Sequence, residues 1–194
     1  MSLSGERLLS ALRETGAFLK GHFLLTSGRH SADYIEKFRL LERPHLVAEV
    51  CQEWKRRLEG QDITIVVGPA VGGIVLAYEL ARQLGCRYAF AEGESHSREL
   101  RRGFVIGPDD RAVVVDDVVT TGGSLMATVK AVRQMGASLV AAAILVYRGQ
   151  QPLNWDVPLE ILLHLPLETY PPDDCPLCQK GESLVIPKRS SLSR

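Results

Sequence analysis

The sequence predicts an α/β fold in which a central, mainly parallel sheet is flanked by helices. Two segments with one layout predict it: an apolar strand, a glycine-rich turn and a helix follow one another at residues 63–84 and again at residues 112–135. Strands made of small or β-branched apolar residues suit a parallel sheet that is buried on both faces. The very apolar segment at residues 138–146 predicts a further strand of this sheet.

The chain has 194 residues, of which 45% are hydrophobic, and this suits one domain with a real core. Its net formal charge is zero, so bulk electrostatics gives no reason to expect nucleic acid or an anionic membrane as a partner. No apolar run approaches the roughly 20 residues that span a bilayer, and residues 1–13 lack the pattern of a signal peptide. The expected location is the cytoplasm, and residues 187–194 are expected to form a disordered tail.

Periodicity and turn residues predict the remaining elements. Amphipathic patterns predict helices at residues 5–15 and 44–58. Short strands are expected within residues 17–31 and at residues 87–91, 104–106 and 158–163, with a turn at 108–110 and irregular chain over 166–178. The segment at 92–103 is almost wholly polar and shows no period, which predicts either a mobile functional loop or a solvated connection.

The four cysteines comprise two isolated residues and one pair. Cys51 and Cys86 are expected to be small buried side chains. Cys175 and Cys178 form a C-x-x-C pair, which is the spacing of half a zinc site. Neither a second pair nor a nearby histidine accompanies them in the sequence, so four ligands would require a partner chain. The prediction is therefore a local turn whose cysteines are free or oxidised.

Two adjacent carboxylates follow the apolar run at 112–115. Ligands of open α/β sheets bind outside the carboxyl ends of the strands, so Asp116 and Asp117 are expected on the ligand side. The turn at 120–124 that comes next presents bare backbone N–H groups at a helix N-terminus, which suits a phosphate. A phosphate cradle beside acceptors for hydroxyls or a hydrated metal is what a sugar phosphate needs.

A second glycine-rich turn, at residues 68–73, follows the strand at 63–67. Its three glycines and one proline fit a loop whose backbone approaches a ligand closely, although close packing of helix on strand would also explain a glycine or two. The G-x-x-x-x-G-K-[ST] loop is absent from the sequence, and no G-x-G-x-x-G opens a helix after a strand. Nucleoside triphosphate hydrolysis and a dinucleotide fold are therefore disfavoured.

Cationic side chains occur at three places that could face a ligand. Arg148 follows the strand at 138–146, where a guanidinium could hold a carboxylate in a bidentate pair or be an ordinary strand-end charge. The turn at 22–31 is dense in Ser, Gly, Arg and His, and is either a solvated loop or a cover for an anionic ligand. The arginines and the histidine of the polar segment at 92–103 could close over phosphates.

Residues 113–124, an apolar strand followed by Asp-Asp-Val-Val-Thr-Thr-Gly-Gly-Ser, resemble the phosphoribosyl pyrophosphate (PRPP) motif of type I phosphoribosyltransferases. Residues 68–73 resemble the pyrophosphate loop of that family. Three further segments resemble orotate phosphoribosyltransferases: residues 21–31, Tyr-Arg-Gly at 147–149, and Asp-Cys-Pro-Leu-Cys at 174–178, the last as in a short bacterial branch. The resemblance covers residues 5–186.

The resemblance implies a phosphoribosyltransferase domain over residues 1–186, with a small hood built from residues 1–40 and 150–180. It implies transfer of ribose 5-phosphate from PRPP to orotate, which gives orotidine 5′-monophosphate and pyrophosphate in the synthesis of UMP, a pyrimidine nucleotide. It also implies a homodimer and a flexible loop over the site. A magnesium ion would be held mainly by substrate oxygens and water, with no direct protein ligand.

The implied site residues fall into four sets. The catalytic set is Asp116, Asp117 and the loop cation Arg98. PRPP binding falls to Asp116, Asp117, Val118, Val119, Thr120, Thr121, Gly122, Gly123 and Ser124, the pyrophosphate loop to Ala70, Val71, Gly72 and Gly73, and the orotate contacts to Thr120 and Arg148. The chemistry agrees, because displacing pyrophosphate builds positive charge on the ribose and anionic charge beside the ribose stabilises it.

The polar segment departs from the family. Many orotate enzymes carry an Arg-Lys-Glu run and a further lysine there, whereas this chain has no lysine between residues 85 and 129. The available cations are His96, Arg98, Arg101 and Arg102. Of these, we expect Arg98 to be the loop cation that assists catalysis.

Two alternatives to orotate transfer stay open. One is a phosphoribosyltransferase for a purine or for uracil, against which Arg148 and the turn at 23–31 argue, because they suit a carboxylated pyrimidine. The other is a non-catalytic, PRPP-binding regulator, for example one that binds RNA. Zero net charge and the lack of a basic stripe in the sequence argue against it.

Overall fold

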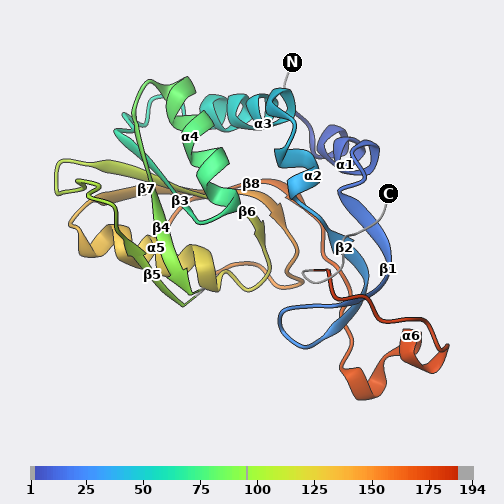
Figure 1. Cartoon of the computed structure of the whole chain (residues 1–194). Coiled ribbons are helices and arrows are strands. Elements are labelled where there is room, and N and C mark those ends of the chain that lie inside the picture. The colour runs from blue at the N-terminus through green and yellow to red at the C-terminus, as the bar shows by residue number, and fades with distance from the viewer. Residues whose placement is uncertain (1–2, 95, 188–194) are drawn as a thin grey trace.

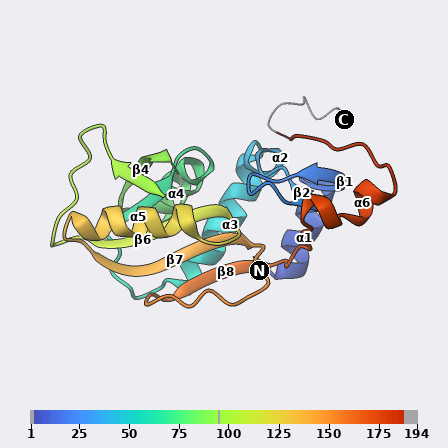
Figure 2. The same cartoon turned by 90° about the horizontal axis from the view of Figure 1, so that it is seen from below.

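The computed structural model describes residues 3–94 and 96–187. It has a larger body, in which helices cover a sheet, and a smaller lobe beside it (Figure 1). Seen from below, β1, β2 and α6 form this lobe at one end of the molecule (Figure 2). The tail predicted at 187–194 lies outside the described residues, apart from Pro187.

The body is built on a six-stranded sheet with the strand order β5-β4-β3-β6-β7-β8. The strands are β3 (Ile65–Pro69), β4 (Arg87–Glu94), β5 (Ser97–Leu100), β6 (Arg111–Val119), β7 (Ser138–Tyr147) and β8 (Leu159–His164). Neighbouring strands pair in parallel, except that β5 runs antiparallel to β4 at one edge. The predicted α/β fold with a mainly parallel sheet is therefore confirmed.

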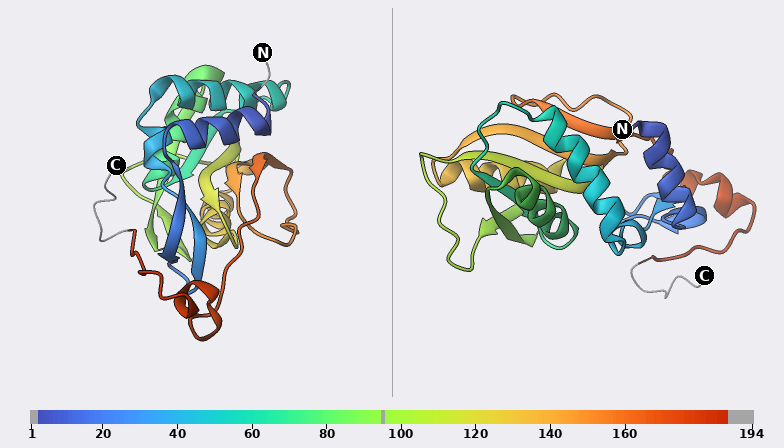
Figure 3. Two further views of the ribbon diagram at one scale, coloured as in Figure 1. Left: turned by 90° about the vertical axis from the view of Figure 1, so that its right-hand side faces the viewer. Right: turned by 90° about the horizontal axis from the view of Figure 1, so that it is seen from above.

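Helices cover both faces of this sheet. α3 (Pro44–Arg57) and α4 (Gly72–Leu84) lie over one face, as the view from above shows, and α5 (Gly123–Gln134) lies over the other (Figure 3). Successive side chains of β6 point to opposite faces of the sheet and so belong to different parts of the core. Val113 packs with the buried residues of α3 and α4, whereas Val114 packs with those of α5. Because both faces are covered, β6 is apolar at successive positions.

Two further helices complete the α3 side of the core. α1 (Gly5–Glu14) contributes Leu8 and Leu12, and α2 (Phe38–Leu41) contributes Leu40, all buried. None of the helices in the described part of the chain is both long enough and apolar enough to cross a membrane.

The smaller lobe, which we call the hood, joins an N-terminal hairpin to the C-terminal segment. Its hairpin consists of β1 (Phe18–Leu24) and β2 (His30–Ile35), which pair antiparallel. Residues 165–187 follow β8 and include the 3₁₀ helix η1 (Pro172–Asp174) and the short helix α6 (Pro176–Gln179). Backbone hydrogen bonds tie this C-terminal segment to the hairpin at His22, Leu24 and His30, so segments far apart in the sequence lie side by side.

The edge of the sheet differs from the sequence-based expectation. The polar segment at 92–103 is not a plain loop, because β4 runs on to Glu94 and pairs with β5 as a hairpin. Gly93 permits this with a φ of +111°, a conformation that side chains disfavour. The strand predicted at 104–106 is wrong: these residues are described and form no strand, and Phe104 instead packs its ring against those of Tyr88 and Phe90.

Candidate active site

The acidic pair lies where β6 extends beyond its neighbour β3. Pairing between β6 and β3 ends at Val114, whereas pairing between β6 and β7 continues to Val119. The strand therefore runs through Asp116 and Asp117 instead of ending before them, which corrects the prediction made from the apolar run alone. Beyond the paired end of β3, Asp117 lies against Gly72 in the next turn.

Asp117 is buried and is paired with a lysine that the sequence analysis missed. Lys37 Nζ lies 2.9 Å from Asp117 Oδ1 and 2.7 Å from Oδ2. The second contact is a close ion pair without hydrogen-bond geometry, so Oδ2 has no hydrogen-bond partner among the described residues. Lys37 precedes α2 and lies far from Asp117 in the sequence, so only the fold brings the two side chains together.

Asp116 is almost fully buried and accepts a hydrogen bond of 2.8 Å from the backbone N–H of Asp117. Burial, and then the neighbouring charge of Asp117, raise the pKa of Asp116 above that of an ordinary aspartate, and the charges of Lys37 and Arg98 offset this only in part. The body therefore holds two carboxylates side by side in a poorly solvated position. Groups that donate hydrogen bonds to this pair would favour its ionised form.

The turn after β6 has the geometry of an anion site. Gly122 has a φ of +86°, and a side chain there would overlap the ring of Trp155, so glycine is required for two reasons. The first N–H groups of α5, from Gly123 onward, have no partners inside the helix and point out of its N-terminus. Thr120 and Thr121 are exposed at this turn, so their side chains are accessible to a ligand.

The turn after β3 is packed directly against the acidic pair. A side chain on Gly72 would overlap the Asp117 carboxylate, and one on Gly68 would overlap the backbone of Gly73. The backbone N–H of Ala70 donates to the carbonyl of Ala91, which fixes the turn to β4. Both glycine-rich turns that the sequence analysis singled out therefore border the acidic pair, one by packing against Asp117 and the other by following it at the end of β6.

Among the described cations of the segment 92–102, Arg98 alone reaches the glycine-rich turn after β6. Its Nη2 donates to Ser124 Oγ over 3.1 Å, and its Nε is buried without a hydrogen-bond partner. The guanidinium groups of Arg101 and Arg102 are instead paired with Glu99 and Glu92. The exposed ring of the remaining cation, a histidine at position 96, lies 3.5 Å from Glu94.

Arg148 lies where the body meets the hood. Its backbone N–H donates to the carbonyl of Val119 over 2.8 Å, so it is held beside the end of β6. Its guanidinium is buried, and Nε has no hydrogen-bond partner among the described residues. Burial lowers the pKa of Arg148, while the charges of Tyr34 and Asp33 from the hood raise it. A buried cation with an unused donor is suited to an anionic ligand.

The turn at 22–31 uses its polar side chains to hold the hood together. Arg29 donates to the hydroxyl and the carbonyl of Thr169, and the hydroxyl of Ser31 donates to the carbonyl of Glu168. Neither interpretation of this turn, a solvated loop or a cover for an anionic ligand, describes these two side chains, because both bind the C-terminal segment.

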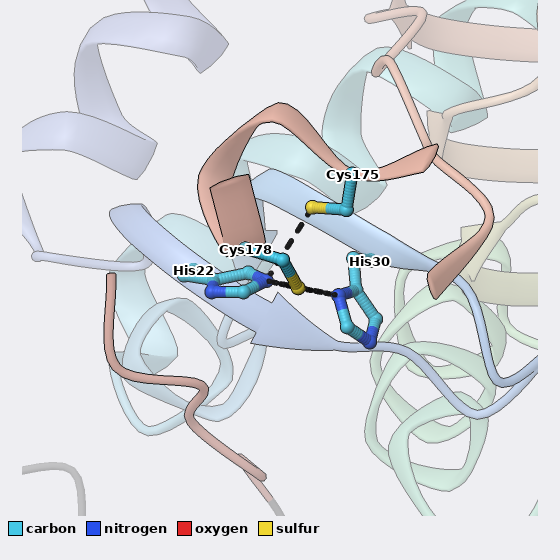
Figure 4. Close-up of side chains that lie close together, drawn as sticks. All are labelled: His22, His30, Cys175 and Cys178. Atoms are coloured by element: carbon cyan, nitrogen blue, oxygen red, sulfur yellow. Dashed lines mark hydrogen bonds between the residues drawn. The ribbon is translucent and has the colours of Figure 1, made fainter. Parts of the chain in front are cut away.

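The structure corrects one expectation about the C-x-x-C pair, namely that four metal ligands there would require a partner chain. Cys175 and Cys178 are free, so they are not oxidised to a disulfide. The side chains of His22 and His30 lie beside them, although neither histidine is near them in the sequence (Figure 4).

A broad surface concavity of about 1440 Å³ lies elsewhere, at the amino ends of the strands. Residues 58–63, which lead into β3, and the end of α4 line it. It contains none of the residues named above, and chemistry in open α/β sheets belongs at the opposite, carboxyl end. We therefore place the site at the acidic pair and not at this concavity.

Comparison with known proteins identifies the family of the chain. The model of the family described as "Phosphoribosyl transferase domain" matches residues 41–163, a segment that holds the acidic pair and both glycine-rich turns. The chain belongs to this family.

Within the family, the chain is similar to orotate phosphoribosyltransferases. It is 42% identical to that of Desulforamulus reducens over 185 residues, which cover 95% of this chain and 97% of the relative. It is 44% identical to that of Thermotoga petrophila over 170 residues, which cover 88% and 91%. The crystal structure of orotate phosphoribosyltransferase from Aeropyrum pernix matches with a TM-score of 0.70 and 28% identity, over 81% of this chain and 93% of that one. The resemblance predicted from the sequence is confirmed.

The raised pKa of Asp116 predicts the sign of its effect on stability. The protonated form is favoured in the folded state, so stability falls as the pH rises from the ordinary pKa of an aspartate through the raised one. Asp116→Asn cannot ionise, and we expect its unfolding free energy at pH 7 to exceed that of the parent by at least about 1 kcal/mol. Urea unfolding at several pH values measures this, and the difference should vanish at acid pH.

Asp110 is a control, because its pKa is shifted in the opposite direction and its replacement should change stability in the opposite sense. Burial raises the pKa of Asp110, but hydrogen bonds from Thr64, Arg87 and the backbone of Gly107 outweigh burial and lower it overall. Asp110→Asn should therefore be less stable than the parent at pH 7, with the difference shrinking as the pH falls. A loss of stability in Asp116→Asn at pH 7 would contradict the electrostatic account of the acidic pair.

Proposed function

We propose that this protein transfers ribose 5-phosphate from PRPP to orotate, which gives orotidine 5′-monophosphate and pyrophosphate, a step of UMP synthesis. Relatives that are 40–44% identical over most of the chain are orotate phosphoribosyltransferases. The observation that carries the choice of base is Arg148, a buried guanidinium with an unused Nε donor beside the end of β6. Such a group suits the carboxylate of orotate, whereas adenine, hypoxanthine and uracil have no carboxylate.

The proposed reaction breaks the bond from C1 of the ribose to pyrophosphate and forms a bond from C1 to a ring nitrogen of orotate, which gives up its proton. The ribose ring becomes positively charged as pyrophosphate leaves. Asp116 and Asp117 would hold the ribose hydroxyls and place negative charge beside that ring. The N–H groups at the start of α5 would hold the 5′-phosphate, and residues 70–73 would face the pyrophosphate.

Magnesium is the proposed cofactor, and the site fits an ion that is held indirectly. Asp117 is already paired with Lys37, and the raised pKa of Asp116 makes it a poor direct ligand. An ion that binds pyrophosphate and ribose oxygens and keeps its remaining waters suits these residues better, as is usual for magnesium. Once bound, it would neutralise charge on the leaving pyrophosphate.

We propose that orotate and PRPP are the substrates and that residues 1–186 act as one domain. The hood then belongs to the site, because Lys37 follows its hairpin and the carbonyl of Arg148 accepts a hydrogen bond from the N–H of Leu167 in its C-terminal segment. We also propose a cytoplasmic location, where four free cysteines would stay reduced.

The assay that tests the function incubates the protein with PRPP, magnesium and one base at a time. We expect the absorbance of orotate to be lost, with no turnover of adenine, hypoxanthine or uracil, and we expect chelation of magnesium to stop the reaction. Replacing Asp116 and Asp117 together by Asn should abolish turnover and leave the folded state intact. Turnover of a purine without turnover of orotate would overturn the proposal.

Replacing Arg148 tests the proposed contact with the carboxylate of orotate in the same assay. Arg148→Ala should raise the KM for orotate at least about tenfold, because a charge-assisted contact is lost, and should change the KM for PRPP far less. Arg82→Ala, whose exposed guanidinium pairs with Glu79 at the far end of α4, is the control and should leave both constants unchanged. Equal effects of Arg148→Ala on both substrates would argue against a carboxylate contact.

We propose that Arg98 is the loop cation that assists catalysis, since it alone among the described cations of its segment reaches the glycine-rich turn after β6. Arg98→Gln should lower kcat by about 100-fold, the usual effect of removing one donor to developing charge. Arg101→Gln, which removes an exposed guanidinium paired with Glu99, should change kcat by less than about twofold. Similar losses in both variants would show that the loop acts through its overall charge.

We propose that the protein is a homodimer that uses the exposed face of α4. Val71, Val75 and Tyr78 are 66%, 40% and 54% exposed and recur with helical spacing, and the ring of Tyr78 contacts that of Tyr88. This apolar face runs directly into the turn that would hold pyrophosphate, so a second copy packed there would border the site.

Sedimentation velocity tests the dimer. The parent should sediment as a dimer at micromolar concentration, and Tyr78→Asp should sediment as a monomer, because a charge would be buried without a partner. Met135→Asp places the same charge at another exposed apolar position, at the end of α5, and should remain dimeric. A monomeric parent would rule out this face as a stable interface.

A further inference from the structure

Four potential metal ligands from three parts of the hood converge on one point (Figure 4). His22 comes from β1, His30 from β2, and Cys175 and Cys178 from the N-cap and the body of α6. One ligand atom from each residue lies within 4.8 Å of every other. We propose that this cluster binds one zinc ion, which acts as a structural cross-link of the hood.

The distances between the ligand atoms are close to those of a zinc tetrahedron. Zinc bonds to nitrogen and sulfur require edges of about 3.3 Å between two nitrogens and about 3.6 Å between nitrogen and sulfur. His22 Nε2 lies 3.6 Å from Cys175 Sγ and 3.7 Å from Cys178 Sγ, and His30 Nδ1 lies 3.4 Å from Cys178 Sγ. The two nitrogens are 2.9 Å apart, so a small separation of the rings would admit the ion.

The ring of His22 is oriented as it is in metal sites. Its Nδ1 lies 2.8 Å from the backbone carbonyl of Glu182, which can only accept a hydrogen bond, so Nδ1 carries the proton. In this tautomer the lone pair of Nε2 faces the two sulfurs and His30 Nδ1. Donation from the second ring nitrogen to a carbonyl is the usual arrangement around a zinc-bound histidine.

The hairpin explains why the two histidines meet. Leu24 pairs with His30, and side chains two residues apart on a strand share a face, so His22 lies on the face of His30 as its diagonal neighbour. A bulge between Lys20 and Phe23 adjusts the strand at this point. The carbonyl of His22 accepts from the N–H of Val185, and His30 exchanges backbone hydrogen bonds with Tyr170, so the C-terminal segment is bonded to both strands of the hairpin on either side of α6 in the sequence.

Burial and charge also favour zinc. His22, His30 and Cys175 are almost fully buried, whereas Cys178 is exposed and offers a path for the ion. Two thiolates neutralise a divalent ion, so the filled site has no net charge, which suits a poorly solvated position. Two sulfurs and two nitrogens select zinc over magnesium and calcium, and four protein ligands leave no open position, so the role is structural and not catalytic.

The experiment measures metal in the purified full-length protein after growth in zinc-containing medium. We expect about one zinc per chain in the parent, and at least about a tenfold loss of zinc in the double variant Cys175→Ser with Cys178→Ser. Cys86→Ser removes a thiol outside the cluster and should keep its zinc. A parent without zinc, or with iron in its place, would overturn the proposal, as would zinc that survives in the double variant.

Cobalt provides a readout that does not depend on transferase activity. After the zinc is removed with a chelator under reducing conditions, added Co²⁺ should give thiolate-to-metal and tetrahedral ligand-field absorption in the parent and in Cys86→Ser, but not in the double variant. The chelator should also lower the melting temperature of the parent and not that of the double variant. Absence of the cobalt spectrum, or a disulfide between Cys175 and Cys178 in the reduced preparation, would overturn the proposal.

Discussion

The ion pair between Lys37 and Asp117 is the contact on which the site depends. Asp117 is buried next to a second carboxylate, and this arrangement is unfavourable unless a cation lies close to it. Lys37 supplies that cation from the chain between the hood hairpin and α2, whereas Asp117 belongs to the central strand β6. This one ion pair therefore offsets the unfavourable burial of two neighbouring carboxylates and joins the hood to the body. Removing the lysine would leave an unpaired buried charge, at a cost of about 3–5 kcal/mol.

The rest of the site follows from the excess length of β6. The pairing of β3 with β6 ends at Val114 of β6. The turn after β3 therefore occupies the space in front of the acidic pair. Glycine at position 72 is required because any side chain would overlap Asp117. Close packing therefore accounts for glycine in both turns, at positions 68 and 72 in one and at position 122 in the other. The proposed role in ligand binding needs the same glycines, because only a bare backbone could approach a ligand as closely.

Site residues that follow one another in the chain were predictable from the sequence, whereas contacts between residues far apart in the chain were not. An apolar run, two carboxylates and a glycine-rich turn occur within residues 112–124, so their juxtaposition needs no tertiary information. By contrast, Lys37 and Asp117 are 80 residues apart, and His22 is 153 residues from Cys175. The extent of β6 was also missed, because strand ends are set by pairing with β7 and not by apolar residues.

The composition of the hood explains why a metal cross-link would matter there. Its hairpin contributes Ile35 to the main core, but buried Phe23 belongs to neither of the core clusters formed by the described residues. A small lobe with so little apolar interior needs another source of stability, and metal ligation is a common one. Leu167 of the C-terminal segment is bonded to the backbone of Arg148, and Lys37 follows the hairpin, so the order of the hood bears directly on the site. A zinc ion between hairpin and C-terminal segment would fix that order without occupying the site itself.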